Sequence, residues 1–152
     1  MLLDVNGIHL LPPAFALVDG CFDPLHRGHI EYFQLARSLG WPLLCNLACD
    51  AYILSRKGRP PLLPQEDRLR VVNAIRYVDF TCLAEHSTAW SLEHFRPRCY
   101  VKGADWRGRL PAEEVRICGE RGIEIVYLDC PRDSSTRLLQ AFIEKLQLPR
   151  AA

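Results

Sequence analysis

The sequence predicts an α/β fold in which helices cover both faces of a doubly wound parallel sheet. Short apolar runs alternate along the chain with amphipathic segments of helical periodicity. Such alternation is typical of strand–helix–strand units, whose right-handed crossovers build parallel sheets. The chain has 152 residues, the length of one domain, and no repeat, low-complexity segment or linker divides it. We therefore expect a single domain over residues 1–152.

The first half of the chain begins with a buried strand over residues 14–20, an apolar run that ends in a turn. Residues 29–40 have apolar positions at helical spacing and stop at a glycine, which is a common helix C-cap. The apolar run 41–50 predicts a second strand. Residues 55–64 carry three basic residues and three prolines, and they predict an irregular basic loop because proline fixes φ and lacks a donor.

The second half repeats the alternation of strands and helices. The predicted elements are a helix over 65–77, a strand over 80–84, a short helix over 91–95, a strand over 98–103, a helix over 111–122, a strand over 123–129 and a last helix over 134–148. Pro111 opens one of these helices and Gly122 closes it, while Ser134 or Ser135 is the expected N-cap of the last one.

Composition excludes several classes of function. Apolar residues make up 49% of the chain and charged residues 24%, as in ordinary globular proteins. A formal net charge of +1 argues against nucleic acid or an anionic membrane as a partner. The chain lacks an uninterrupted apolar run of about 18 residues and a basic leader before an apolar segment. We therefore expect a cytoplasmic protein.

Seven cysteines require a choice between disulfides, metal ligands and packing. The number is odd and most of them lie inside apolar runs, which favours buried, reduced thiols in a cytoplasmic protein. Cys45 and Cys49 have a separation that suits a metal, but a second ligand pair at metal spacing is missing. We expect core packing and no structural metal.

The residues that suggest chemistry follow the first predicted strand. In parallel sheets ligands bind beyond the carboxyl ends of the strands, and there the chain reads GCFDPLHRGH over residues 20–29. His26 and His29 are three residues apart at the start of a helix, so both lie on one face. Free backbone N–H groups and the helix dipole favour an anion at this position. Two imidazole donors there suit a phosphate that gains charge in its transition state. The alternatives are simple capping, or a metal with Asp23 as third ligand.

GCFDPLHRGH resembles the GxFDxLHxGH signature of the cytidylyltransferase-like nucleotidyltransferases. The resemblance covers about residues 15–146, which we take as the core of the domain. KGRP at 57–60 with the following PQEDRLRVVNAIRYVD is similar to the basic loop and ERxxxxxxxxxVD stretch of that family. VKGADW at 101–106 resembles both the VKGGDY of heptose-phosphate adenylyltransferases and the GDDW of glycerol-3-phosphate cytidylyltransferases. SSTR at 134–137 is similar to the SST/STT signature. The fold that the resemblance implies is Rossmann-like.

The resemblance implies roles for the matching residues. His26 and His29 contact the NTP phosphates, and Lys57 is a mobile lysine that neutralises the α-phosphate or the acceptor phosphate. The residues implied to bind the nucleotide are Cys21, Phe22, Asp23, Gly28, Arg68, Gly103, Asp105, Trp106, Ser134, Ser135 and Thr136. Those expected at the acceptor are Asp50, Lys102 and Arg132. At residues 18–20, 48–50 and 137 the chain differs from the pattern of the family. These differences affect what can be inferred about the base of the nucleotide and about the acceptor.

Ordinary structural roles compete with several of these assignments. Lys57 is alternatively part of a solvated basic loop, and Lys102 a surface residue at a strand end. Arg68 on an exposed helix would pair with Glu66 or Asp67. Trp106 would be a core or interface aromatic, and Ser135 is an N-cap in either case.

The expected reaction follows from these groups. An acceptor phosphate is already ionised at neutral pH, so its attack on the α-phosphorus of an NTP needs positioning and charge neutralisation more than a base. Mg²⁺ is expected on the NTP phosphates, with few direct protein ligands. The leading hypothesis is adenylyl transfer to a heptose-1-phosphate-like acceptor. The alternatives are cytidylyl transfer to glycerol-3-phosphate or a similar alcohol phosphate, then FAD synthesis, then a nucleotide-binding module without catalysis. The resemblance also implies a homodimer.

Overall fold

The computed structural model describes residues 1–130 and 134–147 and contains one six-stranded parallel sheet. The strands lie in the order β1-β4-β3-β2-β5-β6, and every neighbouring pair is parallel. Their bounds are β1 Leu2–Leu3, β2 Ala16–Gly20, β3 Leu43–Ala48, β4 Phe80–Ala84, β5 Cys99–Gly103 and β6 Glu124–Leu128. The predicted fold class is confirmed.

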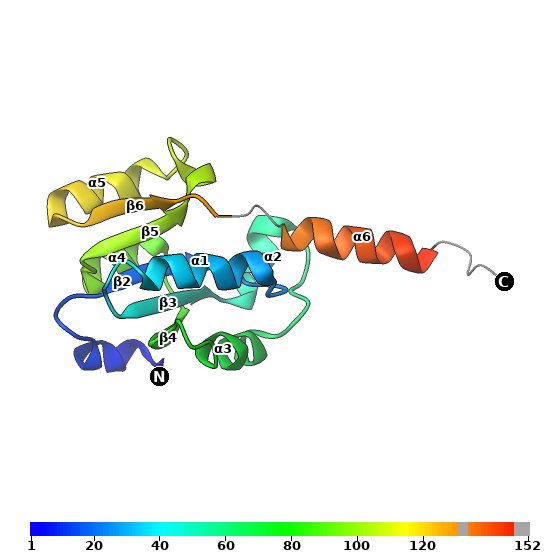
Figure 1. Cartoon of the computed structure of the whole chain (residues 1–152), viewed down its shortest axis with the longest axis horizontal. Helices are drawn as coiled ribbons and strands as arrows, with labels where there is room; N and C mark the ends of the chain where they lie inside the picture. Colours follow the sequence, from blue (N-terminus) through cyan, green and yellow to red (C-terminus); the bar gives the residue numbers. More distant parts are fainter. Residues whose placement is uncertain (131–133, 148–152) are drawn as a thin grey trace.

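Among the described residues, five α-helices lie between strands, and a sixth, α6, follows β6 (Figure 1). They are α1 Arg27–Arg37, α2 Asp50–Lys57, α3 Gln65–Asn73, α4 Thr88–Phe95, α5 Ala112–Arg121 and α6 Ser135–Gln147. Two 3-10 helices, η1 Val5–Leu10 and η2 Ala104–Trp106, complete the described elements.

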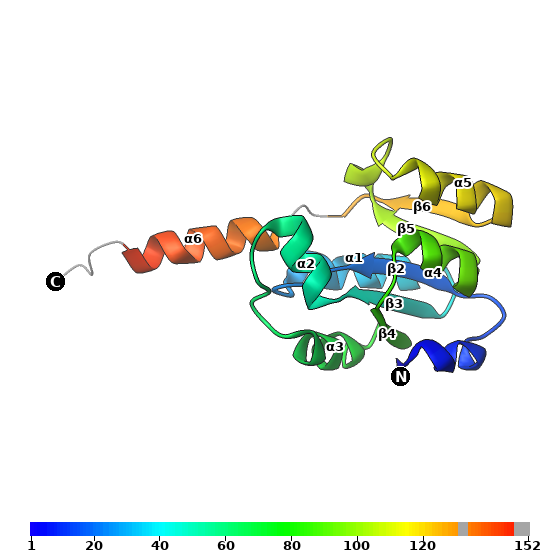
Figure 2. The ribbon, with the colours of Figure 1, turned by 180° about the vertical axis from the view of Figure 1, so that it is seen from behind.

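Alternate residues of the strands face two hydrophobic clusters, one on each side of the sheet. Ala16 and Val18 of β2 pack in the cluster that contains the buried face of α1. Leu17, between them, packs with α4 and α5 on the opposite side. Figure 2 shows α4 and α5 on the face away from α1. The central strands β2, β3 and β5 are buried on both faces, which explains why their sequences read as continuous apolar runs.

The sequence-based prediction was wrong around residues 50–57. The chain forms helix α2 where we expected a strand end at residue 50 and an irregular loop from residue 55. The helix ends because Gly58 adopts a left-handed conformation with φ of 62° and donates its N–H to Leu54 O. The prolines act only after this cap, so the irregular segment is 58–64. In addition, α3 ends at Asn73 before the predicted residue 77, and neither β1 nor η1 was predicted.

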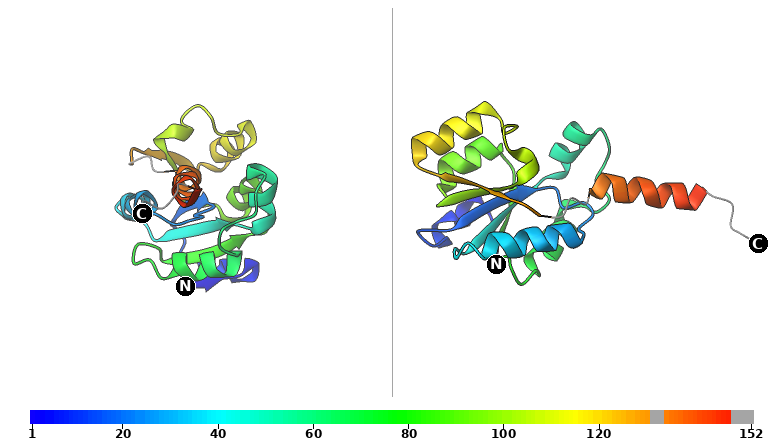
Figure 3. Two further views of the ribbon diagram at one scale, coloured as in Figure 1. Left: turned by 90° about the vertical axis from the view of Figure 1, so that its right-hand side faces the viewer. Right: turned by 45° about the horizontal axis from the view of Figure 1, so that its top comes forward.

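Helix α6 extends away from the sheet, as the views of Figure 3 show. Four large apolar side chains of this helix are more than 40% exposed: Leu138, Phe142, Ile143 and Leu146. Within the described ranges, none of the helices is long and apolar enough to cross a membrane. All seven cysteines are free thiols, and Cys45, Cys82, Cys99 and Cys118 are buried.

Candidate active site

The middle of the sheet contains a topological switch point, the position at which parallel sheets bind ligands. From β2 the chain proceeds to β3 and β4 on one side, and it later adds β5 and β6 on the other. Helices α1 and α2 follow the carboxyl ends of β2 and β3, and η2 follows β5. Two pockets lie at these strand ends.

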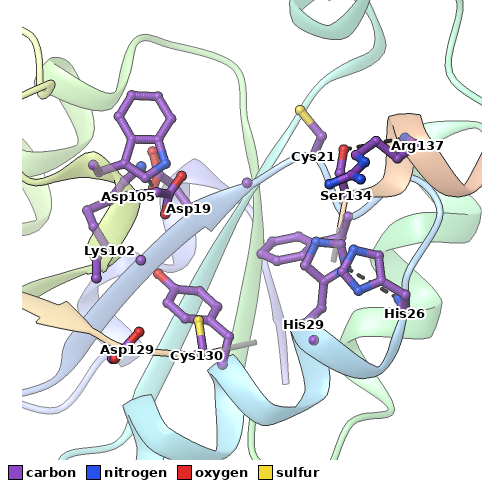
Figure 4. Close-up of a pocket in the computed structure, with 17 residues that line it drawn as sticks. Asp19, Cys21, His26, His29, Lys102, Asp105, Asp129, Cys130, Ser134 and Arg137 are labelled. Atoms are coloured by element: carbon purple, nitrogen blue, oxygen red, sulfur yellow. Dashed lines mark hydrogen bonds and ion pairs between the residues drawn. The ribbon is translucent and has the colours of Figure 1, made fainter. Parts of the chain in front are cut away.

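The first pocket has a volume of about 360 Å³ and opens between the β2–α1 turn, η2, the end of β6 and the start of α6. Figure 4 shows His26 and His29 on one side of this pocket and Lys102, Asp19 and Asp105 on the other. The lining residues are Asp19, Gly20, Cys21, Phe22, His26, Gly28, His29, Tyr32, Lys102, Gly103, Ala104, Asp105, Trp106, Asp129, Cys130, Ser134 and Arg137.

The second pocket, of about 280 Å³, lies toward α2, α4 and α5. It shares Asp19, Gly20, Cys21, Phe22, His29, Lys102 and Trp106 with the first pocket. Its other lining residues are Asn46, Ala48, Tyr52, Arg56, Lys57, Ala84, His86, Thr88, Pro111, Glu114 and Ser135. The two pockets therefore meet at His29 and at the ends of β2 and β5.

The two histidines stack against each other at the start of α1, with ring centroids 3.7 Å apart. His26 is the N-cap residue, and its backbone N–H donates to His29 Nδ1 at 3.3 Å. An imidazole that accepts at Nδ1 carries its proton on Nε2 when neutral. Burial, together with the charges of His26 and Lys57, lowers the pKa of His29 to about 3. His29 is therefore a neutral hydrogen-bond donor at physiological pH.

Two glycines allow this close approach of backbone and side chains. A Cβ on Gly20 would lie 2.9 Å from the ring of Phe22, which in turn contacts His29 edge-on. A Cβ on Gly103 would lie 2.5 Å from an oxygen of Asp105. These residues hold the turns after β2 and β5 in shapes that a larger side chain would disturb.

Asp23 is fully buried and binds the 58–64 segment. Its carboxylate accepts from the backbone N–H groups of Leu62 and Leu63 and from Arg59 Nη1 at 3.1 Å. Although burial opposes ionisation, these donors hold the pKa of Asp23 below its usual range. Asp23 lines neither pocket, so the structure places it as an anchor of this segment and not as a third ligand beside the histidines.

Arg68 is also buried, 1% exposed, where the sequence suggested an exposed helix and pairing with Glu66 or Asp67. Its guanidinium donates to Cys21 O and Ala48 O, both at 2.8 Å, and to Leu63 O. Its ion pair is with Asp50, at 2.6 Å. Neither Arg68 nor Asp50 lines a pocket. This pair ties the ends of β2 and β3 to α3.

Lys102 is buried, 7% exposed, and forms an ion pair with Asp19 at 2.7 Å. Its ammonium also lies 4.3 Å from the centroid of the Trp106 ring, a cation–π contact. It is therefore not the surface residue that one hypothesis suggested. Lys102, Asp19 and Trp106 line both pockets.

Lys57 is the last residue of α2 and lines the second pocket with Arg56. It is exposed and close enough to lower the pKa of His29 through its charge. The segment after it is fastened to Asp23 through Arg59, Leu62 and Leu63, so residues 59–63 are more restrained than a free loop.

The remaining predicted residues divide between the pockets. Gly28, Gly103, Asp105 and Ser134 line the first pocket, and Cys21, Phe22 and Trp106 line both. Ser135 lines the second, and its Oγ donates to Pro24 O at 2.9 Å. Thr136 is exposed and lines neither pocket. Arg132 lies outside the described residues.

Sequence reasoning missed several lining residues as site residues. In the first pocket these are Asp19, Tyr32, Asp129, Cys130 and Arg137. In the second they are Asn46, Tyr52, Arg56, His86, Thr88 and Glu114. Asp129 and Cys130 directly follow β6, so the strand-end rule that led to the histidines could have found them.

Within residues 1–130 and 134–147, three or more His, Cys, Asp or Glu side chains never gather in a way that could hold a metal ion. Protein donors for a resident metal are thus not evident in the described part of the chain. Any Mg²⁺ in the reaction would depend mainly on the oxygens of a bound triphosphate.

Comparison with known proteins agrees with the fold and the motif. A family model described as cytidylyltransferase-like matches residues 17–141. The FAD synthase of Pyrococcus abyssi is 48% identical over 117 residues, covering 74% of this chain and 78% of that protein. The bifunctional protein HldE of Trichlorobacter lovleyi is 34% identical over 131 residues, which are 84% of this chain and 26% of that protein. The chain thus spans about a quarter of this bifunctional relative.

A lipopolysaccharide core biosynthesis protein from Thermoplasma volcanium has a similar crystal structure, with a TM-score of 0.65. The match covers 80% of this chain and 98% of that one at 23% identity, so it supports the fold alone. Taken with the HxGH turn, the two pockets and the family match over residues 17–141, these findings show that the chain belongs to the cytidylyltransferase-like family of nucleotidyltransferases.

Proposed function

We propose that this protein transfers an adenylyl group from ATP to a small phosphorylated sugar or polyol and releases pyrophosphate. The observation that carries the proposal is the meeting of two pockets at His29 and at the ends of β2 and β5. A transferase must hold donor and acceptor on either side of the reacting phosphorus. The first pocket would hold the nucleotide, and the second the acceptor.

In the proposed reaction an oxygen of the acceptor phosphate attacks the α-phosphorus of ATP. A new P–O bond forms, the bond to the β-phosphate bridging oxygen breaks, and pyrophosphate takes the electron pair. His29, a neutral donor through Nε2, would stabilise the charge that gathers on the phosphoryl oxygens, and His26 would act beside it. Mg²⁺ bound to the triphosphate would supply further charge neutralisation.

The start of α6 borders the first pocket through Ser134 and Arg137. Free N–H groups at a helix N-terminus, a hydroxyl and a guanidinium suit the β- and γ-phosphates of the nucleotide. Gly103, Asp105 and Trp106 would border the nucleoside. Arg68 and Asp23 would not contact the substrates and would instead hold the turn that carries the histidines in position.

The names of the relatives favour ATP over CTP. FAD contains an adenylyl group, so the similarity to FAD synthases involves adenylyl transfer. The segment VKGADW at 101–106, which resembles that of heptose-phosphate adenylyltransferases, agrees with ATP as the donor. Cytidylyl transfer to glycerol-3-phosphate is the alternative that the DW sequence at 105–106 first suggested.

The basic residues of the second pocket support a phosphorylated acceptor. Arg56 and Lys57 come from the last turn of α2, and Lys102 lies at the end of β5. A volume of about 280 Å³ suits a small acceptor such as a heptose-1-phosphate. The 48% identity to an FAD synthase favours FMN as a second candidate acceptor.

Pyrophosphate release is the experiment that tests this function. Purified protein is incubated with Mg²⁺ and either ATP or CTP, with a heptose-1-phosphate, glycerol-3-phosphate or FMN as acceptor. We expect turnover with ATP and the sugar phosphate, and none without an acceptor. Turnover with CTP and glycerol-3-phosphate, or with ATP and FMN, would select an alternative. Nucleotide binding without turnover on any acceptor would favour a non-catalytic module.

A further inference from the structure

A carboxyl group of the second pocket has no role in the reaction described above. Glu114, on α5, lines this pocket, and its Oε2 lies 3.1 Å from the hydroxyl of Tyr100. The same hydroxyl lies 3.1 Å from Asp19 Oδ2. A phenol has one proton to donate, so two ionised carboxylates cannot both be satisfied by Tyr100.

Two carboxyl groups in contact with one hydroxyl need a second proton, carried by one of the two carboxyl groups. The hydrogen bonds of Asp19 indicate which of them carries it. Asp19 accepts from Lys102 Nζ at 2.7 Å and from Thr88 Oγ1 at 3.0 Å. Both oxygens of Asp19 thus accept hydrogen bonds from other residues, and the Tyr100 hydroxyl is placed to be a further donor to Asp19. Tyr100 then donates its proton to Asp19, and Glu114 donates its own proton to the phenol oxygen of Tyr100.

Other charges around Glu114 agree with this arrangement. Burial and the negative charge of Asp19 raise the pKa of Glu114, and Glu113 on the same helix adds to the effect. The charge of Lys102 and the hydrogen bond with Tyr100 act in the opposite direction, but the pKa of Glu114 is raised overall. On the packed helix α4, Glu93 pairs with Arg121.

Two further cations line the second pocket with Glu114, and a histidine lines it as well. Arg56 and Lys57 come from α2, and His86 precedes α4. A neutral Glu114 would leave this pocket with an excess of positive charge, which an acceptor phosphate requires. Its second oxygen, Oε1, is not used by the contact to Tyr100 and can accept a hydrogen bond from a ligand.

We propose that Glu114, held by Tyr100, is a specificity-determining residue that binds a hydroxyl group of the acceptor in its protonated, uncharged form. This inference rests on the proposed function. It adds to the proposed function that the acceptor carries a hydroxyl group that α5 recognises.

The protonation state is tested without any acceptor. Carboxyl-labelled glutamate is introduced and followed by ¹³C NMR through a pH titration. Loss of one signal in Glu114→Gln and of another in Glu113→Gln identifies the two residues. We expect Glu114 to keep its proton to a higher pH than the exposed Glu113. A midpoint at or below that of Glu113 would overturn the inference.

Recognition is tested by acceptor kinetics with the best acceptor of the pyrophosphate assay and its deoxy analogues. We expect Glu114→Ala to raise the acceptor KM about tenfold, the usual effect of one lost hydrogen bond, with the ATP KM unchanged. Glu114→Gln keeps a neutral acceptor oxygen and restores the wild-type KM, and Glu113→Gln serves as the matched control. For the deoxy analogue that lacks the recognised hydroxyl, wild type and Glu114→Ala should have the same KM.

The outcomes separate this inference from the proposed function. Wild-type protein that releases no pyrophosphate with any acceptor overturns the proposed function, and the acceptor role of Glu114 with it. Turnover with an acceptor KM unchanged by Glu114→Ala overturns only the inference. Equal increases in the KM of every acceptor and of ATP would mean that Glu114 acts through packing, and would overturn it as well.

Discussion

His26 and His29 stack at the first turn of α1, and both reach the pocket assigned to the nucleotide. Replacing either by alanine removes one donor that is already oriented before the reaction. We expect each variant to lower turnover about 100-fold or more, with a smaller loss of nucleotide affinity. Steady-state kinetics of pyrophosphate release measure this, with His94→Ala on the exposed side of α4 as the control. Near-normal turnover in both site variants would end the argument for a phosphate clamp.

The low pKa of His29 also affects how the free energy of unfolding depends on pH. In the folded protein the pKa of His29 is lowered to about 3, whereas in the unfolded chain it has the ordinary histidine value of about 6.5. Between these values the unfolded state binds more protons, so the contribution of His29 to stability is lost as the pH falls. Urea unfolding of wild type and His29→Gln at several pH values should show a weaker pH dependence in the variant over this range. Identical slopes would contradict it.

At the scale of elements, Arg68 joins the ends of β2 and β3 to α3. Arg68→Ala removes the donor of three carbonyl groups and the ion-pair partner of Asp50. We expect the free energy of unfolding to fall by about 3 kcal/mol, mainly because buried carbonyl groups lose their charged donor. Denaturant unfolding measures this, and Arg70→Ala, on the exposed face of the same helix, should have little effect. An equally small change in Arg68→Ala would show that the guanidinium is dispensable for the fold.

The position of Lys57 is set by an element boundary, because it is the last residue of helix α2. A charge at this helix end next to His29 would stabilise the transition state more than the bound nucleotide. We expect Lys57→Ala to lower kcat while the KM for ATP stays within several-fold of wild type. Arg70→Ala is again the control in a steady-state assay. An unchanged kcat would remove Lys57 from the set of catalytic residues.

These elements also show how far sequence reasoning reaches. Apolar runs and glycine or proline signals located strands β2 to β6 and most helices, because burial and chain reversal have strong local patterns. Helix α2 was missed because its short amphipathic pattern has one buried residue, Ile53, and a basic end that resembles a loop. Arg68 was misread because a fully buried arginine depends on carbonyl groups supplied by two other strand ends.

At the scale of the whole molecule, the candidate site depends on sheet order more than on any single motif. The HxGH turn was visible in the sequence. The second pocket was not, because it combines the ends of β2 and β5 with side chains from α2, α4 and α5. Glu114 and Asp19 are 95 residues apart in sequence and contact the same Tyr100 hydroxyl only once the sheet is formed.

Helix α6 has several large apolar side chains exposed to solvent. Its 13 residues extend from the sheet with Leu138, Phe142, Ile143 and Leu146 exposed. A helix of this length is only marginally stable in water without packing, and exposed apolar clusters of this kind are typical of interaction surfaces. Since symmetric pairing is the commonest form of oligomer, we expect two copies to cover these faces in a homodimer.

Light scattering at micromolar concentration should give twice the mass of the chain, which is 17.4 kDa. Phe142→Glu combined with Leu146→Glu should shift the protein to the monomer, because two carboxylates cannot be buried unpaired in an apolar interface. Lys145→Glu, which alters charge on the same helix without removing an apolar side chain, is the control and should remain dimeric. Circular dichroism separates dissociation from unfolding, because the loss of α6 alone would leave most of the helical signal in place. A monomeric wild-type protein would contradict the prediction, and a dimer that survives both glutamates would show that the copies pair through another face.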